Sequence, residues 1–195
     1  MKDNALFIQR FCAYIIDVII IVFLASLISI PFMKSDNVSN LNDSIQELSS
    51  SYIKGKIDNK TFINEYSSIY FQLEQQQGAY LIIGIILNIL YFIVLQFYTG
   101  QTLGKKILKI KVESTRKHLT MNQMVVRGLL INSILLTLIE LAFVIFGNKG
   151  TFIYIVGSFE LIQYTFMIIC AFMIMFRKDR LGLHDLICNT KVVRC

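Results

Sequence analysis

The sequence predicts an all-α membrane protein with four transmembrane helices. Hydrophobic residues make up 55% of the 195 residues and charged residues only 16%, whereas soluble domains carry about 25% charged residues. The mean hydropathy is +0.60. Four apolar runs each approach or reach the length of about 17–25 residues that a helix needs to cross a bilayer. Little of the chain is left for a separate soluble domain.

The predicted spans cover residues 11–33, 79–98, 129–146 and 152–176 of a single membrane domain, residues 1–195. The first run is too long for the apolar region of a secretory signal peptide. It also contains Asp17 and lacks a small-residue cleavage site. The first run is therefore interpreted as a span.

The placement of lysine and arginine predicts the orientation, because cytoplasmic loops carry an excess of these residues. The loop at residues 34–78 has four lysines against six acidic residues. The loop at residues 99–128 has seven basic residues against one acidic residue, and the tail from Arg177 has five against two. Both termini and the loop at 99–128 are therefore expected in the cytoplasm. The net charge of +6 is therefore interpreted mainly as an orientation signal. No compact basic domain is left to bind nucleic acid.

Both long loops are expected to contain structure. In the outer loop, Ser44 and Glu47 have capping-box spacing, and apolar residues recur at helical intervals in 45–52 and 62–73. These patterns predict two amphipathic helices that either pack on the outer ends of the spans, the preferred interpretation, or form a ligand-binding cap. In the inner loop, apolar residues alternate with lysines at 107–112 and turn-forming residues follow, which predicts a short β-hairpin-like structure.

Polar residues inside the predicted spans are candidate functional groups, since an ionisable side chain there costs about 2.5–3.5 kcal/mol or more. They are Asp17, Asn88, Glu140, Glu160 and Gln163. Facing one another, they would form a staggered path for a proton or a small cation such as sodium. The competing interpretation is structural. Asp17 would then accept hydrogen bonds or pair with a basic residue, and each glutamate would stay neutral and donate a hydrogen bond.

No enzyme, cofactor or metal site is expected. His184 and Asp185 are adjacent, but a metal site needs more ligands at defined spacings, and the only other histidine is His118. The glycines before Lys105 lack the spacing of a phosphate-binding loop. The four cysteines include no C-x-x-C pair, and a reducing cytoplasmic side disfavours disulfides.

Three motifs occur in order along the chain. RFCAYIID begins at Arg10, GQTLGKKILKIKV follows the second span, and RKDRLGLHDLICNTKVV follows the fourth. Together they resemble the RDD family of bacterial integral membrane proteins, named for one Arg and two Asp. The resemblance implies that these residues are Arg10, Asp17 and Asp185, and that the protein lies in a bacterial cell membrane. It also implies transport of ions or other ligands, with sodium/proton exchange suggested for some members. The long outer loop, Glu140 and Glu160 depart from a minimal member.

We therefore expect a transporter of a small cation or proton, similar to a sodium/proton exchanger, surrounded by the lipid bilayer. Arg10, Asp17 and Asp185 would form its charge network, with Arg10 and Asp185 clustered at the inner face just below Asp17. Basic residues near that face are Lys105, Lys106, Arg127 and Arg180. A homo-oligomer is expected because four helices enclose little room for a path. The alternative is a non-transporting adaptor or scaffold whose Arg/Asp network is structural, and a third possibility is lipid recognition by the inner lysines.

Overall fold

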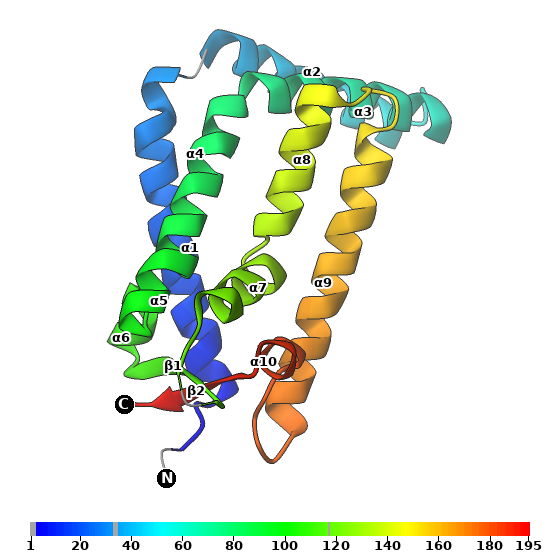
Figure 1. Cartoon of the computed structure of the whole chain (residues 1–195). Coiled ribbons are helices and arrows are strands. Elements are labelled where there is room, and N and C mark those ends of the chain that lie inside the picture. The colour runs from blue at the N-terminus through cyan, green and yellow to red at the C-terminus, as the bar shows by residue number, and fades with distance from the viewer. Residues whose placement is uncertain (1–2, 33–34, 117) are drawn as a thin grey trace.

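The computed structural model describes residues 3–32, 35–116 and 118–195 as a bundle of helices with a small two-stranded sheet. Within these described ranges, three helical segments are long and apolar enough to cross a membrane: Phe7–Phe32, Gly78–Thr99 and Phe152–Phe176. A fourth span is present if the bent pair Met121–Ile131 and Ile134–Phe146 is counted as one. Both termini lie at the same end of the bundle, called the terminal end below, and the opposite end is called the distal end (Figure 1). The predicted class, a mostly helical membrane protein, is confirmed.

The first span consists of α1 (Phe7–Ser29) and the 3₁₀ turn η1 (Ile30–Phe32). Its buried residues recur every fourth position and are Ala13, Asp17, Ile21, Ala25 and Ser29. Small residues in this stripe let neighbouring helices approach closely, while the large apolar residues on the other faces are exposed toward lipid. The helix starts before the predicted residue 11, so Arg10 lies inside its first turn. Met33, the predicted end of this span, and Lys34, the first residue of the outer loop, lie outside the described residues.

The second span changes its helical type halfway. It consists of α4 (Gly78–Asn88), the π-helical segment η2 (Ile89–Leu95) and α5 (Gln96–Thr99). It ends at Gly100, whose φ of 72° is the left-handed conformation that glycine tolerates best. π-Helical segments are rare and frequently occur at functional sites. The sequence contained no signal for this segment.

The third predicted span, 129–146, is interrupted. Helix α7 (Met121–Ile131) and helix α8 (Ile134–Phe146) meet at an angle of 68°. The polar pair Asn132–Ser133 lies at the break, with Ser133 in a left-handed conformation of φ 54°. Small polar side chains compete with helical hydrogen bonds, which explains why the helix stops there. Gln163 then donates a 2.9 Å hydrogen bond to the carbonyl oxygen of Leu130 near the break.

The distal end is covered by the predicted outer loop. Helices α2 (Ser35–Ile53) and α3 (Asn59–Gln76) lie across the ends of the spans, as Figure 1 shows, and are longer than the two predicted amphipathic segments. Aromatic rings form a continuous row along them and onto the start of α9 (Phe152–Phe176): Tyr52, Phe62, Tyr66, Tyr70 and Phe152. The two helices therefore pack on the bundle through an apolar contact surface.

At the terminal end, segments from three parts of the chain assemble. Helix α6 (Leu103–Ile107) leads into β1 (Ile110–Ser114), and α10 (Leu183–Cys188) leads into β2 (Thr190–Arg194). The predicted β-hairpin-like inner loop is wrong, because β1 pairs antiparallel with β2 from the C-terminal tail. Burial explains this pairing, since residues of both strands join Ala5 and Met124 in one apolar core. Lys117, in the predicted turn, lies outside the described residues.

Candidate functional site

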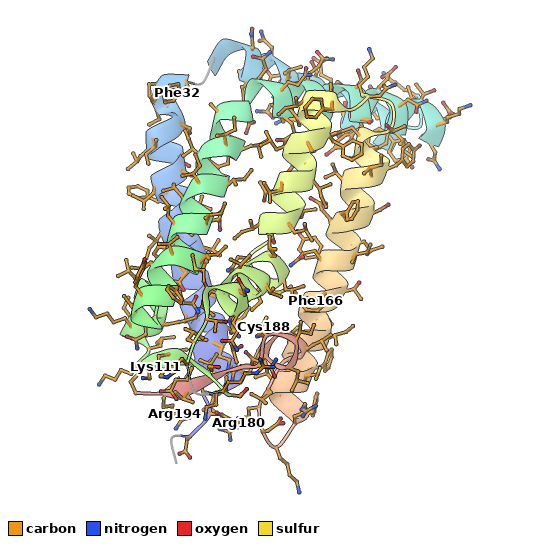
Figure 2. The ribbon with its side chains drawn as sticks, in the orientation of Figure 1. Phe32, Lys111, Phe166, Arg180, Cys188 and Arg194 are labelled. Atoms are coloured by element: carbon orange, nitrogen blue, oxygen red, sulfur yellow. The ribbon has the colours of Figure 1, made fainter. Side chains whose placement is uncertain are left out.

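Asp185 is the centre of an ion-pair cluster at the terminal end. Its carboxylate accepts a 2.7 Å hydrogen bond from Arg10 and another from Arg127, and both pairs are almost completely buried. Arg10 also donates 2.9 Å to the backbone carbonyl of Arg180. The predicted clustering of Arg10 with Asp185 is thus present, and it joins the first span to the C-terminal tail. Figure 2 shows Arg180, Cys188 and Arg194 near one another at this end, far from Phe32.

Further donors complete the environment of Asp185. The backbone N–H of Gly182 lies 3.2 Å from Oδ2, the Thr190 hydroxyl 3.4 Å from Oδ1, and His184 Nε2 3.3 Å from Oδ1. Arg127 also donates 2.8 Å to the Thr190 hydroxyl. Sequence reasoning missed the roles of Thr190 and His184, because their proximity depends on the turn between α10 and β2.

This environment keeps Asp185 ionised. Burial pushes the pKa of Asp185 upward, but the charge of Arg127, the hydrogen bond from His184 and the charge of Arg10 together hold it well below its usual range. Burial and the neighbouring charge of Arg127 lower the pKa of His184. His184 is therefore neutral at pH 7, with its Nε2–H directed to Asp185.

Asp17 occupies a separate site that does not include Arg10. The carboxylate is fully buried and accepts three hydrogen bonds: from the Tyr91 hydroxyl at 2.6 Å, the Thr102 hydroxyl at 2.5 Å and the Gly104 N–H at 2.7 Å. Tyr91 lies in η2, and Thr102 and Gly104 lie at the start of α6. Asp17 therefore fixes the second span and α6 against α1, as the structural alternative to ion binding predicts.

Glycine is required at position 104 because α6 approaches α1 so closely. A Cβ atom there would lie 2.3 Å from the Ala13 carbonyl oxygen and 2.8 Å from Asp17 Oδ1. Neither atom can move aside easily, since one is backbone and the other is held by hydrogen bonds. The GQTLGK motif is thus a docking element for Asp17, with Thr102 and Gly104 as its two contacts.

Lys105 follows this docking element and points toward the protein interior. Its ammonium donates 2.9 Å to Gln96 Oε1. Burial, with the positive charge of Arg127 as the second cause, lowers the pKa of Lys105 to about 7, against the opposing effect of Asp17 and Asp185. Lys106, the next residue, is exposed. Lys105 is therefore a group that can exchange a proton near neutral pH.

A cavity of about 460 Å³ lies between the Asp185 cluster and the Asp17 site. Its walls come from α1, the second span, α7, α9 and the C-terminal segment, and they are mostly apolar. Its polar lining residues include Arg10, Asp17, Gln96, Lys105, Arg127 and His184. The cavity therefore borders Asp17 and the partners of Asp185, namely Arg10, Arg127 and His184.

The structure does not bring all residues of the predicted path to the cavity that Asp17 borders. The Asn88 side chain donates a hydrogen bond to the carbonyl oxygen of Gly84 in its own helix. The Gln163 side chain donates one to the carbonyl oxygen of Leu130. Neither residue lines the cavity that Asp17 borders, and neither do Glu140 and Glu160. The two glutamates belong to the distal half of the bundle, where they influence Tyr70 and Glu74 of α3.

Tyr70, Glu74, Glu140 and Glu160 make up a distal acidic group. Burial raises the pKa of Glu74, the hydrogen bond with Tyr70 opposes this, and the charge of Glu160 adds to the increase. Burial and the three glutamates also raise the pKa of Tyr70. Among the described residues, no ion pair includes any of these carboxylates, and no group of three side chains has the composition of a metal site.

The fold and these sites define a helical multi-span membrane protein whose C-terminal tail is joined to the first span and to α7 by buried Arg–Asp pairs. The RDD family model matches residues 4–189, which include Arg10, Asp17 and Asp185. The chain belongs to the RDD family. Comparisons with curated proteins and with solved structures give no match.

Proposed function

We propose that this protein moves protons, or a small cation in exchange for protons, across the bacterial cell membrane, with both termini in the cytoplasm. The observation that carries the proposal is the position of Lys105. This residue lines the cavity of about 460 Å³ together with Asp17, and its pKa is about 7. The excess of basic residues in both tails and in the loop at 99–128 supports the orientation.

The charge balance of the cavity makes proton binding at Lys105 and cation binding near Asp17 compete with each other. With Lys105 protonated, Lys105, Arg10 and Arg127 outnumber Asp17 and Asp185, so a sodium ion is repelled. When Lys105 loses its proton, the two arginines and the two aspartates balance. A cation can then approach Asp17, which is the competition that an exchanger requires.

The distal acidic group supports a second proton site nearer the outer surface. Glu74, Glu140 and Glu160 are near enough to raise the pKa of Tyr70 together, and Glu74 takes up a proton more readily than an exposed glutamate. A proton acceptor at each end of the bundle is consistent with transfer between the two sides of the membrane.

Flux in proteoliposomes tests the proposal. The protein is reconstituted with a pH-sensitive dye inside the vesicles, and a sodium or proton gradient is imposed. We expect proton flux from the wild type, at least a tenfold loss in Lys105→Gln and nearly full flux in the adjacent control Lys106→Gln. Flux equal to that of empty vesicles, or equal flux in Lys105→Gln and wild type, contradicts it.

A non-transporting adaptor is the second candidate, because both family aspartates are saturated with hydrogen bonds. Asp17 has three donors, and Asp185 binds two arginines. In this case wild-type vesicles show no flux, while Asp17→Asn lowers the melting temperature. The thermal melt of each variant in detergent, measured beside its flux, separates the two functions.

A further inference from the structure

The cavity next to Asp185 has unused hydrogen-bonding groups. Among the described residues, three buried side-chain nitrogens lack a hydrogen-bond partner: Arg10 Nε, Gln96 Nε2 and His184 Nδ1. All three residues line the cavity of about 460 Å³. The Gln96 residue is 2% exposed, the His184 side chain 7% and the Arg10 side chain 10%. Since buried polar groups are nearly always paired, this concentration at one cavity indicates a missing ligand.

The chemistry of these atoms selects the headgroup of the ligand. Arg10 Nε and Gln96 Nε2 are hydrogen-bond donors, and the ammonium of Lys105 lines the same space. His184 Nδ1 is an acceptor, because the Nε2–H of this neutral imidazole is directed to Asp185, so it takes no part in binding an anion. Among the described residues that line the cavity or form ion pairs with its lining, the only carboxylates are Asp17 and Asp185, which already accept bonds from other groups. An anionic acceptor, such as a carboxylate or a phosphate, therefore complements the polar part of the cavity.

The apolar part of the cavity indicates where the ligand comes from. Phe11 of α1 and Tyr164 and Ile168 of α9 line the cavity and are also 47%, 63% and 56% exposed. They stand on two membrane-spanning helices, and Ile168 is eight residues from the end of α9, roughly 12 Å along its axis. The cavity thus opens sideways between α1 and α9 at a level occupied by lipid. Its volume is within the range of about 300–1,000 Å³ for small-molecule pockets.

We propose that this cavity binds an acidic amphiphile from the bilayer, with its carboxylate or phosphate at Arg10, Gln96 and Lys105 and its acyl chain between α1 and α9. The site goes beyond proton or cation transport and does not depend on it, because the complementarity rests on unpaired donors and on the lateral opening. A bound anion would also keep Lys105 charged and so oppose proton release from it.

The test measures binding, so its outcome is separate from that of the flux experiment. The full chain is placed in nanodiscs of zwitterionic phosphatidylcholine and titrated with palmitate or palmitoyl-lysophosphatidate, with native mass spectrometry as the readout. Hexadecanol supplies the chain without the charge, and acetate and inorganic phosphate supply the charge without the chain. We expect saturable binding of one acidic amphiphile per chain and no comparable binding of the other three probes.

Two pairs of variants locate the binding. Lys105→Gln is expected to weaken binding about tenfold, while the exposed neighbour Lys106→Gln leaves it unchanged. Ala171→Leu fills the cavity and is expected to abolish binding, while Ala142→Leu on the exposed face of α8 retains it. Each variant is compared at equal folded fraction, measured by thermal melting.

Several outcomes would overturn the proposal. Equal binding of hexadecanol and palmitate would reveal a purely apolar groove, and equal binding of inorganic phosphate would indicate an anion taken from solution. Amphiphile binding that neither Lys105→Gln nor Ala171→Leu changes would place the ligand among the general lipids around the protein.

Discussion

The two ends of the bundle use carboxylates in opposite ways. At the terminal end, Asp185 is surrounded by Arg10 and Arg127, and Asp17 by two hydroxyls and a backbone N–H. At the distal end, among the described residues, buried Glu74 has only the hydrogen bond of Tyr70 to oppose burial, and the charge of Glu160 acts in the same direction as burial. Burial disfavours charge at both ends, and the groups around Asp185 outweigh this effect, whereas the hydrogen bond of Tyr70 to Glu74 does not. The comparison teaches that a buried acid locks the fold where donors converge on it and takes up protons where they do not.

Removing the terminal carboxylate should have the largest effect. Asp185→Asn leaves Arg10 and Arg127 buried without their counter-charge, which is expected to destabilise the protein by about 3–5 kcal/mol. Asp179→Asn is the matched control, because the Arg177–Asp179 pair is 43% exposed on both sides and such pairs contribute about 0–1 kcal/mol. The measurement is thermal and denaturant unfolding in detergent. Equal melting of the two variants would mean that Asp185 is not the anchor of this end.

The contact between Asp17 and α6 can be broken by a substitution at Gly104, whose backbone N–H binds the Asp17 carboxylate. Gly104→Ala places a Cβ against Ala13 and Asp17, and such overpacking is expected to cost about 1–3 kcal/mol. Gly84→Ala, inside the second span, is the control, since nothing lies within 4 Å of its added Cβ. That change should stabilise its helix by about 0.8–1.0 kcal/mol. Melting shifts of the same sign in the two variants would contradict the close packing of α6 on α1.

The pH dependence of stability should have opposite signs at the two ends. The pKa of Asp185 is depressed in the fold, so its stabilisation is present above the unfolded value of about 3.9 and is lost as the pH falls below it. The pKa of Glu74 is raised in the fold, so its contribution is full below about 4.3 and is lost as the pH rises through the folded value. Hydrogen exchange of peptides from α10 and α3, corrected for the intrinsic rate, measures both ends in one sample. Parallel loss of protection at both ends on acidification would refute the contrast.

The smallest effect is expected from neutralising a distal carboxylate. Glu74→Gln removes a charge that burial disfavours and keeps the shape of the side chain, so stability at pH 7 should rise by no more than about 1 kcal/mol. The gain should disappear at a pH near 4, where wild-type Glu74 is protonated as well. A lower melting temperature at pH 7 would show that Glu74 is needed in its charged form.

Sequence reasoning predicted those features that depend on composition and local order. The helical spans follow from the apolar runs, and the covering helices α2 and α3 follow from their apolar periodicity. The predicted capping box at Ser44 and Glu47 was wrong, because α2 begins at Ser35 and the Ser44 hydroxyl bonds to the Asn40 carbonyl inside the helix. The pairing of Arg10 with Asp185 was anticipated from the resemblance to the family. The continuous third span and the local hairpin were wrong, because the break at Asn132–Ser133 and the pairing of β1 with β2 depend on neighbours distant in the chain.

The sequence by itself determined that this chain enters a membrane, and it predicts which ends face the cytoplasm, since both follow from apolar length and basic charge. Only the tertiary structure decided what each buried polar residue does. Asp17 could be an ion ligand or an anchor until Thr102 and Gly104 were placed against it, and Lys105 was one lysine among several until α6 turned it into the cavity. The physical reason is that the cost of a buried charge depends on the donors that reach it, and folding brings those donors from distant parts of the chain.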